Sequence, residues 1–174
     1  MFLTGMMGAG KSTAAPLLAA AWGATWVDLD TRIARIFGAP IAALFARGEA
    51  QFRRQEREAL ASLIAEPGFV RRSVVVATGG GVVIDPHNRA MMRSVGRVAL
   101  LRVAPEVLAE RLSADEGRAR PLVAALSGHE LRARLLEVWT QRRSAYEEAD
   151  VVVDAEGSPQ DAVHKLRAAL EVCT

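Results

Sequence analysis

Residues 5–13 read Gly-Met-Met-Gly-Ala-Gly-Lys-Ser-Thr, and this stretch decides the fold. It fits the pattern G-x-x-x-x-G-K-[ST], in which backbone N–H groups surround a phosphate and the lysine reaches its outer oxygens. An apolar segment precedes it and an alanine- and leucine-rich segment follows it, as in a strand, loop and helix. A glycine turn that merely precedes a helix is the weaker interpretation. The motif therefore predicts a loop that binds the phosphates of a nucleotide.

Lysine is rare in this chain, which singles out the lysine of the motif. Twenty of the 22 basic residues are arginine, and lysine stands only at positions 11 and 165. A compact ammonium and a planar guanidinium bind phosphate in different ways. We therefore expect Lys11 to have a function that arginine cannot supply.

The composition excludes several classes of protein. Hydrophobic residues make up 51% of the 174 residues and charged residues 24%, as in a single globular domain with its own core. The basic residues exceed the acidic ones by only 2 and are scattered, which argues against a nucleic-acid partner. Apolar runs are too short to cross a membrane and no secretion signal opens the chain, so we expect a cytoplasmic protein. The single cysteine, Cys173, excludes a disulfide framework and a thiolate zinc site.

Short β-branched segments alternate with longer helical ones along the chain. Residues 74–77 are apolar on both faces, as in a parallel strand covered by helices on each side. Such strands favour a doubly wound α/β sandwich whose ligands bind beyond the carboxyl ends of the strands. Strands are expected at 1–4, 25–29, 74–78, 98–103 and 151–153, and helices are expected to begin near residues 11, 31, 49, 86, 105, 130 and 159.

Two carboxylates follow the second expected strand. Asp28 and Asp30 would share one face of an extended strand, at the edge where ligands bind. Carboxylates there suit Mg²⁺ held through water, or the hydroxyl of an acceptor. Capping of the next helix by Asp30 or Thr31 is an equally open alternative, and both roles can coexist.

Two arginines on expected helices are candidates for binding an anion. Arg142 follows Leu135 and Val138 at steps that place it on the apolar stripe of its helix. A charge on that stripe needs a partner, which is either a bound carboxylate or a structural ion pair. Arg53 has Glu49 at i−4, so spacing alone favours a solvated, salt-bridged face.

Two further stretches break the regular pattern. The glycines at 79–81 follow the third expected strand, where bare backbone would allow close approach of a ligand or simply form a turn. Residues 113–128 are polar, contain glycine and proline, and lie between two helices. A loop of that length in a compact domain is usually functional or disordered. We expect it to be a mobile lid within one domain that spans residues 1–174.

The ordered set of motifs resembles the shikimate kinase family. The motifs are GMMGAGKST at 5–13, DLD at 28–30, GEAQFRRQE at 48–56, ATGGG at 77–81, RPL at 120–122 and RRSAYEEAD at 142–150. The order of these motifs over nearly the whole chain is specific to the family, although only the first motif is distinctive by itself. The resemblance implies a three-layer α/β/α fold with a five-stranded parallel sheet, like that of nucleoside-monophosphate kinases. It also implies transfer of the γ-phosphoryl group of ATP to the 3-hydroxyl of shikimate in aromatic amino-acid biosynthesis, with Mg²⁺ as cofactor.

The resemblance further implies a role for each candidate residue. Asp30 would hold the acceptor hydroxyl in line and accept its proton late, and Arg53 with Arg142 would grip the shikimate carboxylate. The implied roles are catalysis for Lys11, Asp30 and the lid residue Arg120; Mg²⁺ binding for Ser12 and Asp28; ATP binding for Gly8, Ala9, Gly10, Lys11, Ser12, Thr13 and Arg120; and shikimate binding for Asp30, Arg53, Gly80, Gly81 and Arg142.

Some positions depart from the family pattern. Residues 14–16 read Ala-Ala-Pro where the family commonly has a glycine. Ser113 stands where the family has an arginine against adenine, so Arg111 or Arg118 is expected to replace it. The loop at 154–159, on the adenine side, matches only loosely.

Two other functions remain as alternatives, and both assume the same fold. A gluconate or nucleotide kinase would share the phosphate loop, but it gives no reason for both arginines beside the glycine triplet. A ligand-sensing module would bind without turnover, whereas every expected catalytic position is present here. We expect a monomeric enzyme that binds ATP and shikimate.

Overall fold

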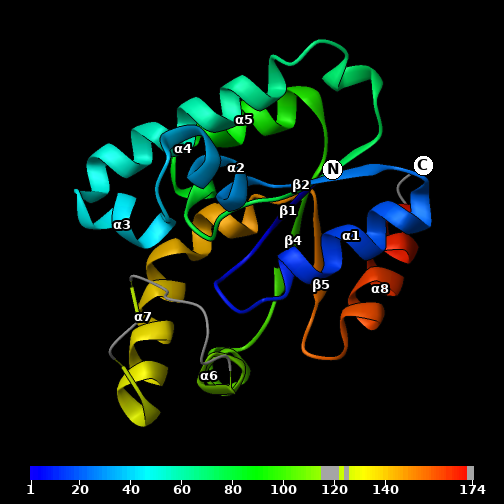
Figure 1. Ribbon diagram of the computed structural model, residues 1–174. Coiled ribbons are helices and arrows are strands. Elements are labelled where there is room, and N and C mark those ends of the chain that lie inside the picture. The colour runs from blue at the N-terminus through cyan, green and yellow to red at the C-terminus, as the bar shows by residue number, and fades with distance from the viewer. Residues whose placement is uncertain (115–121, 124–125, 172–174) are drawn as a thin grey trace.

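The computed structural model describes residues 1–114, 122–123 and 126–171. A parallel sheet of five strands, in the order β2-β3-β1-β4-β5, forms its middle layer. Helices α1 and α8 lie together on one side of the sheet, and α4 and α5 lie on the other (Figure 1). The predicted three-layer α/β/α fold is confirmed.

The bounds of the elements agree closely with the sequence-based expectations. The strands are β1 (Phe2–Thr4), β2 (Thr25–Asp28), β3 (Val74–Ala77), β4 (Val98–Arg102) and β5 (Val151–Asp154). The helices are α1 (Lys11–Trp22), α2 (Leu29–Phe37), α3 (Ile41–Ala46), α4 (Glu49–Ile64), α5 (Pro86–Val95), α6 (Pro105–Ala114), α7 (Gly128–Glu147) and α8 (Pro159–Glu171), with short 3₁₀ helices η1 (Phe69–Arg71) and η2 (Val82–Ile84). Periodicity does not predict α3, because its six residues are too few to show a helical repeat.

Burial along the strands follows their place in the sheet. All four residues of β3 are buried, because its neighbours β1 and β2 cover its edges and helices cover its faces. The edge strands are more open, and in β5 buried and exposed residues alternate. The apolar pattern therefore marks the central strands of the sheet, β1 and β3 among them. Ligands in such sheets bind beyond the carboxyl ends of these strands.

Helix α1 runs without interruption through the segment that departs from the family pattern. Ala14 and Ala15 are buried, and Pro16 lies inside the helix. None of the helices within the described ranges combines the length and apolarity that a membrane span requires.

Candidate active site

The phosphate loop (Gly5–Ser12) connects β1 to α1. Gly8 and Gly10 have φ angles of 80° and 88°, which other residues rarely adopt. Lys11 is only 8% exposed, and its Nζ donates to the carbonyl oxygens of Gly5 at 2.8 Å and Met6 at 2.9 Å. The loop thus holds the ammonium beside the N-terminus of α1, where both would attract a phosphate.

Asp28 connects the phosphate loop to helix α2. Ser12 Oγ donates to Asp28 Oδ2 at 2.6 Å, and Asp28 Oδ1 accepts from the backbone N–H of Thr31 at 3.0 Å. Asp28 is therefore the N-cap of α2, and the expectation that Asp30 or Thr31 caps this helix is wrong. The shared strand face is also wrong, because β2 ends at Asp28 and Asp30 lies in the first turn of α2.

The structure nevertheless brings both carboxylates to one cavity of about 520 Å³. This acceptor cavity begins at Lys11 and Ser12 and reaches Arg53 and Arg142. Its other polar lining is Asp28, Asp30, Thr31, Glu56 and Thr78, and its apolar lining includes Met7, Ile41, Phe45, Phe52 and Leu122. One cavity therefore joins the phosphate loop to a pair of guanidinium groups.

The side chain of Arg53 is more buried than that of a residue on a solvated helix face. The expected i,i+4 pair is present, with Nη2 3.0 Å from Glu49 Oε1, but Nη1 also lies 2.9 Å from Oε2 of Glu56. Its guanidinium carbon lies 5.9 Å from the ring centroid of Phe45 and 5.4 Å from that of Phe52. These contacts fix the guanidinium in the wall of the cavity.

The glycine triplet (Gly79–Gly81) is an acceptor loop whose missing side chains make room for functional groups. A Cβ on Gly79 would stand 2.6 Å from Asp30 Oδ1, and one on Gly81 would stand 2.2 Å from Arg53 Nη1. Their φ angles are not positive, so glycine is favoured here by the close approach of the Asp30 carboxylate and the Arg53 guanidinium rather than by unusual backbone.

Arg142 reaches the same loop from α7. It is half-buried on the side of α7 that carries buried Leu135 and Val138, as predicted, and its Nη1 donates to the carbonyl of Gly80 at 3.3 Å. Arg53 packs against the next residue of the loop, Gly81. Two guanidinium groups from different helices thus border one short segment of backbone.

Glu56 is a site residue that sequence reasoning missed. Its side chain is 1% exposed and lies in the acceptor cavity beside Arg53. Burial raises its pKa to about 7 from 4.5, against the opposing effect of the Arg53 charge. The signal was available, because Glu56 lies on the same helical stripe as buried Phe52 and Leu60, as Arg142 does on α7.

We expect Glu56→Gln to remove a pH dependence of stability. The raised pKa means that the native state keeps a proton which the unfolded chain releases between about pH 4.5 and 7. This contribution is fully present below pH 4.5 and is lost as the pH rises through 7, with a total of roughly 3 kcal/mol. Urea unfolding at pH 5 and pH 8 measures it.

From pH 5 to pH 8 the unfolding free energy of the wild type should therefore fall relative to that of Glu56→Gln, because the uncharged amide does not titrate. Glu58→Gln is the matched control, because Glu58 is exposed on the same helix. A difference that is the same at both pH values would contradict the assignment.

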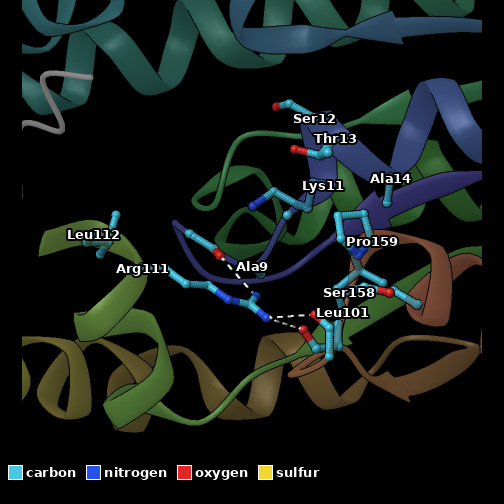
Figure 2. Close-up of a pocket in the computed structure, with 15 residues that line it drawn as sticks. Ala9, Lys11, Ser12, Thr13, Ala14, Leu101, Arg111, Leu112, Ser158 and Pro159 are labelled. Carbon is cyan, nitrogen blue, oxygen red and sulfur yellow. Dashed lines mark hydrogen bonds between the residues drawn. The ribbon is translucent and has the colours of Figure 1, made fainter. Parts of the chain in front are cut away.

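A second cavity, of about 290 Å³, opens on the other side of the phosphate loop. Figure 2 shows Lys11 and Arg111 pointing into it from opposite walls. Arg111 Nη2 donates to the carbonyls of Ala155, Glu156 and Gly157 at 2.7–3.1 Å, and Nη1 donates to Gly8 at 3.4 Å. The guanidinium thus ties the loop after β5 to the phosphate loop and lines the cavity between them.

Residues expected on the adenine side line this second cavity in part. Ser113, at the position where the family has its arginine, is exposed and does not line this second cavity. Arg111, one of the two residues expected to replace that arginine, does line it. The loosely matching loop contributes Ala155, Gly157 and Ser158 to the lining. Arg118, Arg120 and most of the expected lid lie outside the described residues.

The chain is similar in sequence to shikimate kinases over almost its whole length. Residues 7–171 match the sequence profile of the family described as "Shikimate kinase". A shikimate kinase from Thiobacillus denitrificans is 44% identical over 156 residues, which cover 88% of this chain and 80% of that protein. One from Geobacter sulfurreducens is 42% identical over 166 residues, covering 94% and 86%. The structure of shikimate kinase from Acinetobacter baumannii in complex with shikimate is 30% identical with a TM-score of 0.86, covering 99% of this chain and 93% of that one.

Proposed function

This chain belongs to the shikimate kinase family, and we propose that it transfers the γ-phosphoryl group of ATP to the 3-hydroxyl of shikimate with the residues described above. The observation that carries the proposal is that the two cavities share Lys11 and Ser12. ATP would lie in the Arg111 cavity with its phosphates on the phosphate loop. The acceptor would lie in the other cavity, so that the two substrates meet at Lys11.

The polar lining of the acceptor cavity fits the chemistry of shikimate, which has one carboxylate and several hydroxyls. Arg53 and Arg142 would hold the carboxylate, since a guanidinium matches it with two parallel hydrogen bonds. The backbone of Gly80 and Gly81 would face the ring, where a side chain would collide with it. Asp30, which lines the same cavity, would hold the reacting hydroxyl.

The reaction breaks the bond between the γ-phosphorus and the bridging oxygen of ATP and forms a bond to the acceptor oxygen. Because the transition state is loose, positioning and charge neutralisation contribute more than strong basicity. Lys11 would neutralise oxygens of the transferred group, and Asp30 would take the hydroxyl proton as the new bond forms. ADP then carries the charge of the leaving oxygen.

Ser12 and Asp28 are the residues that would hold Mg²⁺ with the nucleotide. Their oxygens lie 2.6 Å apart beside the phosphate loop, and hydroxyl and carboxylate oxygens are ligands that Mg²⁺ accepts. Within the described residues, no group of three or more His, Cys, Asp or Glu side chains could hold a metal without a ligand. The ion would therefore arrive with ATP and neutralise charge on its phosphates.

The remaining assignments follow the family resemblance. Arg120 would swing onto the phosphates from a lid at about 113–128 and add positive charge as transfer proceeds. A monomer is sufficient, because residues of one chain line both cavities. We also propose a cytoplasmic enzyme, for which the single cysteine and the use of ATP are suitable.

A coupled assay of ADP release tests the function directly. With ATP and Mg²⁺, shikimate should support turnover, whereas gluconate and nucleoside monophosphates should not. Comparable turnover with gluconate would support the alternative sugar-acid kinase, and tight binding of shikimate without turnover would support the sensing module.

We expect loss of Arg53 or Arg142 to weaken shikimate binding specifically. Each charge-assisted contact is worth roughly 1.5–3 kcal/mol, so either alanine variant should lose about tenfold to a hundredfold in affinity, with little change for ATP. The double variant should lose less than the sum, because both groups act on one carboxylate. Lysine should rescue poorly, since it keeps the charge without the planar fork. Titration calorimetry with shikimate measures these affinities.

The neighbouring arginines provide matched controls. Arg54 is exposed on α4, and Arg143 is exposed on α7 and paired with Glu147 at 2.7 Å. Arg54→Ala and Arg143→Ala should bind shikimate like the wild type. Unchanged affinity in both Arg53→Ala and Arg142→Ala would reassign the pair to structural ion pairing.

A further inference from the structure

Tyr146 is the only tyrosine of the chain and lies one turn after Arg142 on α7. Its side chain is 0% exposed. Its ring stacks on that of Trp139, with centroids 5.7 Å apart and planes inclined by 14°. The stacked ring is large and rigid, so it fixes the direction in which the hydroxyl points.

That hydroxyl contacts both loops of the site. It donates to the carbonyl of Gly80, in the acceptor loop, at 2.5 Å. Met6 Sδ, in the phosphate loop, lies 3.7 Å from the same oxygen. Burial raises the pKa of Tyr146 to about 12, so the hydroxyl remains a donor at every pH suitable for an assay.

The two loops also touch through their backbones beside this hydroxyl. A Cβ on Gly80 would stand 3.4 Å from the carbonyl oxygen of Gly5 and 3.4 Å from the backbone nitrogen of Met7. The carbonyl of Met6 accepts from Lys11 Nζ at 2.9 Å. Met6 thus contacts the proposed catalytic lysine through its backbone and the tyrosine through its sulfur.

We propose that Tyr146 is a positioning residue for phosphoryl transfer, whose hydroxyl holds the acceptor loop against the phosphate loop. The inference rests on the proposed function, because the two loops would carry the two substrates. In-line transfer requires the acceptor oxygen and the γ-phosphorus at a set distance, and a displacement of about 1 Å can cost about 10²-fold in rate. Arg142 also donates to the Gly80 carbonyl. Of these two donors, only Tyr146 also contacts a side chain of the phosphate loop, that of Met6.

Tyr146→Phe tests the proposal, because phenylalanine keeps the ring and its stack on Trp139 but removes the hydroxyl. We expect kcat to fall by about tenfold to a hundredfold while KM for ATP and for shikimate each change by less than about threefold. Thr140→Val is the matched control, since it removes a hydroxyl from the same helix that bonds only locally, to the carbonyl of Leu136 at 2.8 Å. Its kcat should stay within about twofold of the wild type.

Unchanged kcat in Tyr146→Phe would overturn the proposal, and so would an altered KM for one substrate with normal kcat. A lower melting temperature with normal kcat would show a purely structural role and would overturn it as well.

A second measurement does not depend on that variant folding. Because the chain has one tyrosine, 3-fluorotyrosine places a single ¹⁹F label at position 146. Its resonance should shift on saturation with ADP and, in a separate titration, with shikimate, since each ligand would act on one of the joined loops. In a wild type that phosphorylates shikimate, a resonance that moves with only one ligand, or with neither, would overturn the proposal. A wild type that does not phosphorylate shikimate would refute the proposed function instead, and the ADP titration would still report on the loops.

Discussion

Lys11→Ala is expected to lower kcat by about 10³-fold or more while the protein keeps its fold. A single preorganised donor to developing charge is worth about 10²–10³-fold, and a full positive charge on a transferring phosphoryl group is worth at least as much. Nζ is held by two carbonyl oxygens of the phosphate loop, so it is already in place before the nucleotide arrives. Steady-state kinetics and circular dichroism of the variant measure the two halves of this prediction.

The only other lysine provides the control. Lys165 is exposed on α8, and its Nζ donates to the carbonyl of Asp154 at 2.8 Å. Lys165→Ala should therefore leave kcat near the wild-type value. Lys11→Arg should recover little activity, because the bulkier fork does not fit a site built for a compact ammonium. Near-normal kcat in Lys11→Ala would show that the loop does not take part in catalysis.

Asp30→Asn is expected to lower kcat by about 10²-fold or more with only a small change in stability. The amide keeps the shape of the side chain but cannot accept the proton of the acceptor hydroxyl. General-base contributions are typically about 10²–10⁴-fold, and a loose transition state favours the lower end. The stability effect should be small because the cap of α2 is Asp28, so the substitution leaves the capping hydrogen bond in place and removes one charge from the first turn.

Glu130→Gln is the control for that first-turn charge, since Glu130 is exposed in the first turn of α7. It should alter the melting temperature about as much as Asp30→Asn does, while kcat stays near the wild-type value. A normal kcat in Asp30→Asn, with only the melting temperature changed, would remove Asp30 from the chemistry.

The phosphate loop and the sheet could be predicted because their signals are local. Residues 5–13 contain the glycines and the lysine that the loop requires, between a strand and a helix that their own periodicity indicates. The half-buried position of Arg142 could be predicted for the same reason, since its place on an apolar stripe depends only on the repeat of one helix. The misplaced cap of α2 shows the limit, because one residue at the end of β2 decides whether Asp30 extends a strand or begins a helix.

The reason for three consecutive glycines could not be predicted from the neighbouring sequence. The sequence at 79–81 is equally compatible with a flexible turn, and the backbone angles there do not demand glycine. Asp30 comes from α2 and Arg53 from α4, and each occupies the space of a missing side chain, at Gly79 and Gly81 respectively. Periodicity within one element carries no information about groups that other elements bring to it.

By itself, then, the sequence determined the α/β/α layers, the phosphate loop and the family, because repeated spacing within a segment and ordered motifs record them directly. Only the tertiary structure decided that Arg53 is a cavity residue, that Glu56 lies buried with a raised pKa, and that Tyr146 reaches two loops at once. These properties arise from contacts between residues as far apart in the chain as Met6 and Tyr146. Desolvation and hydrogen-bond geometry act across those contacts, and both exist only once the helices have packed against the sheet.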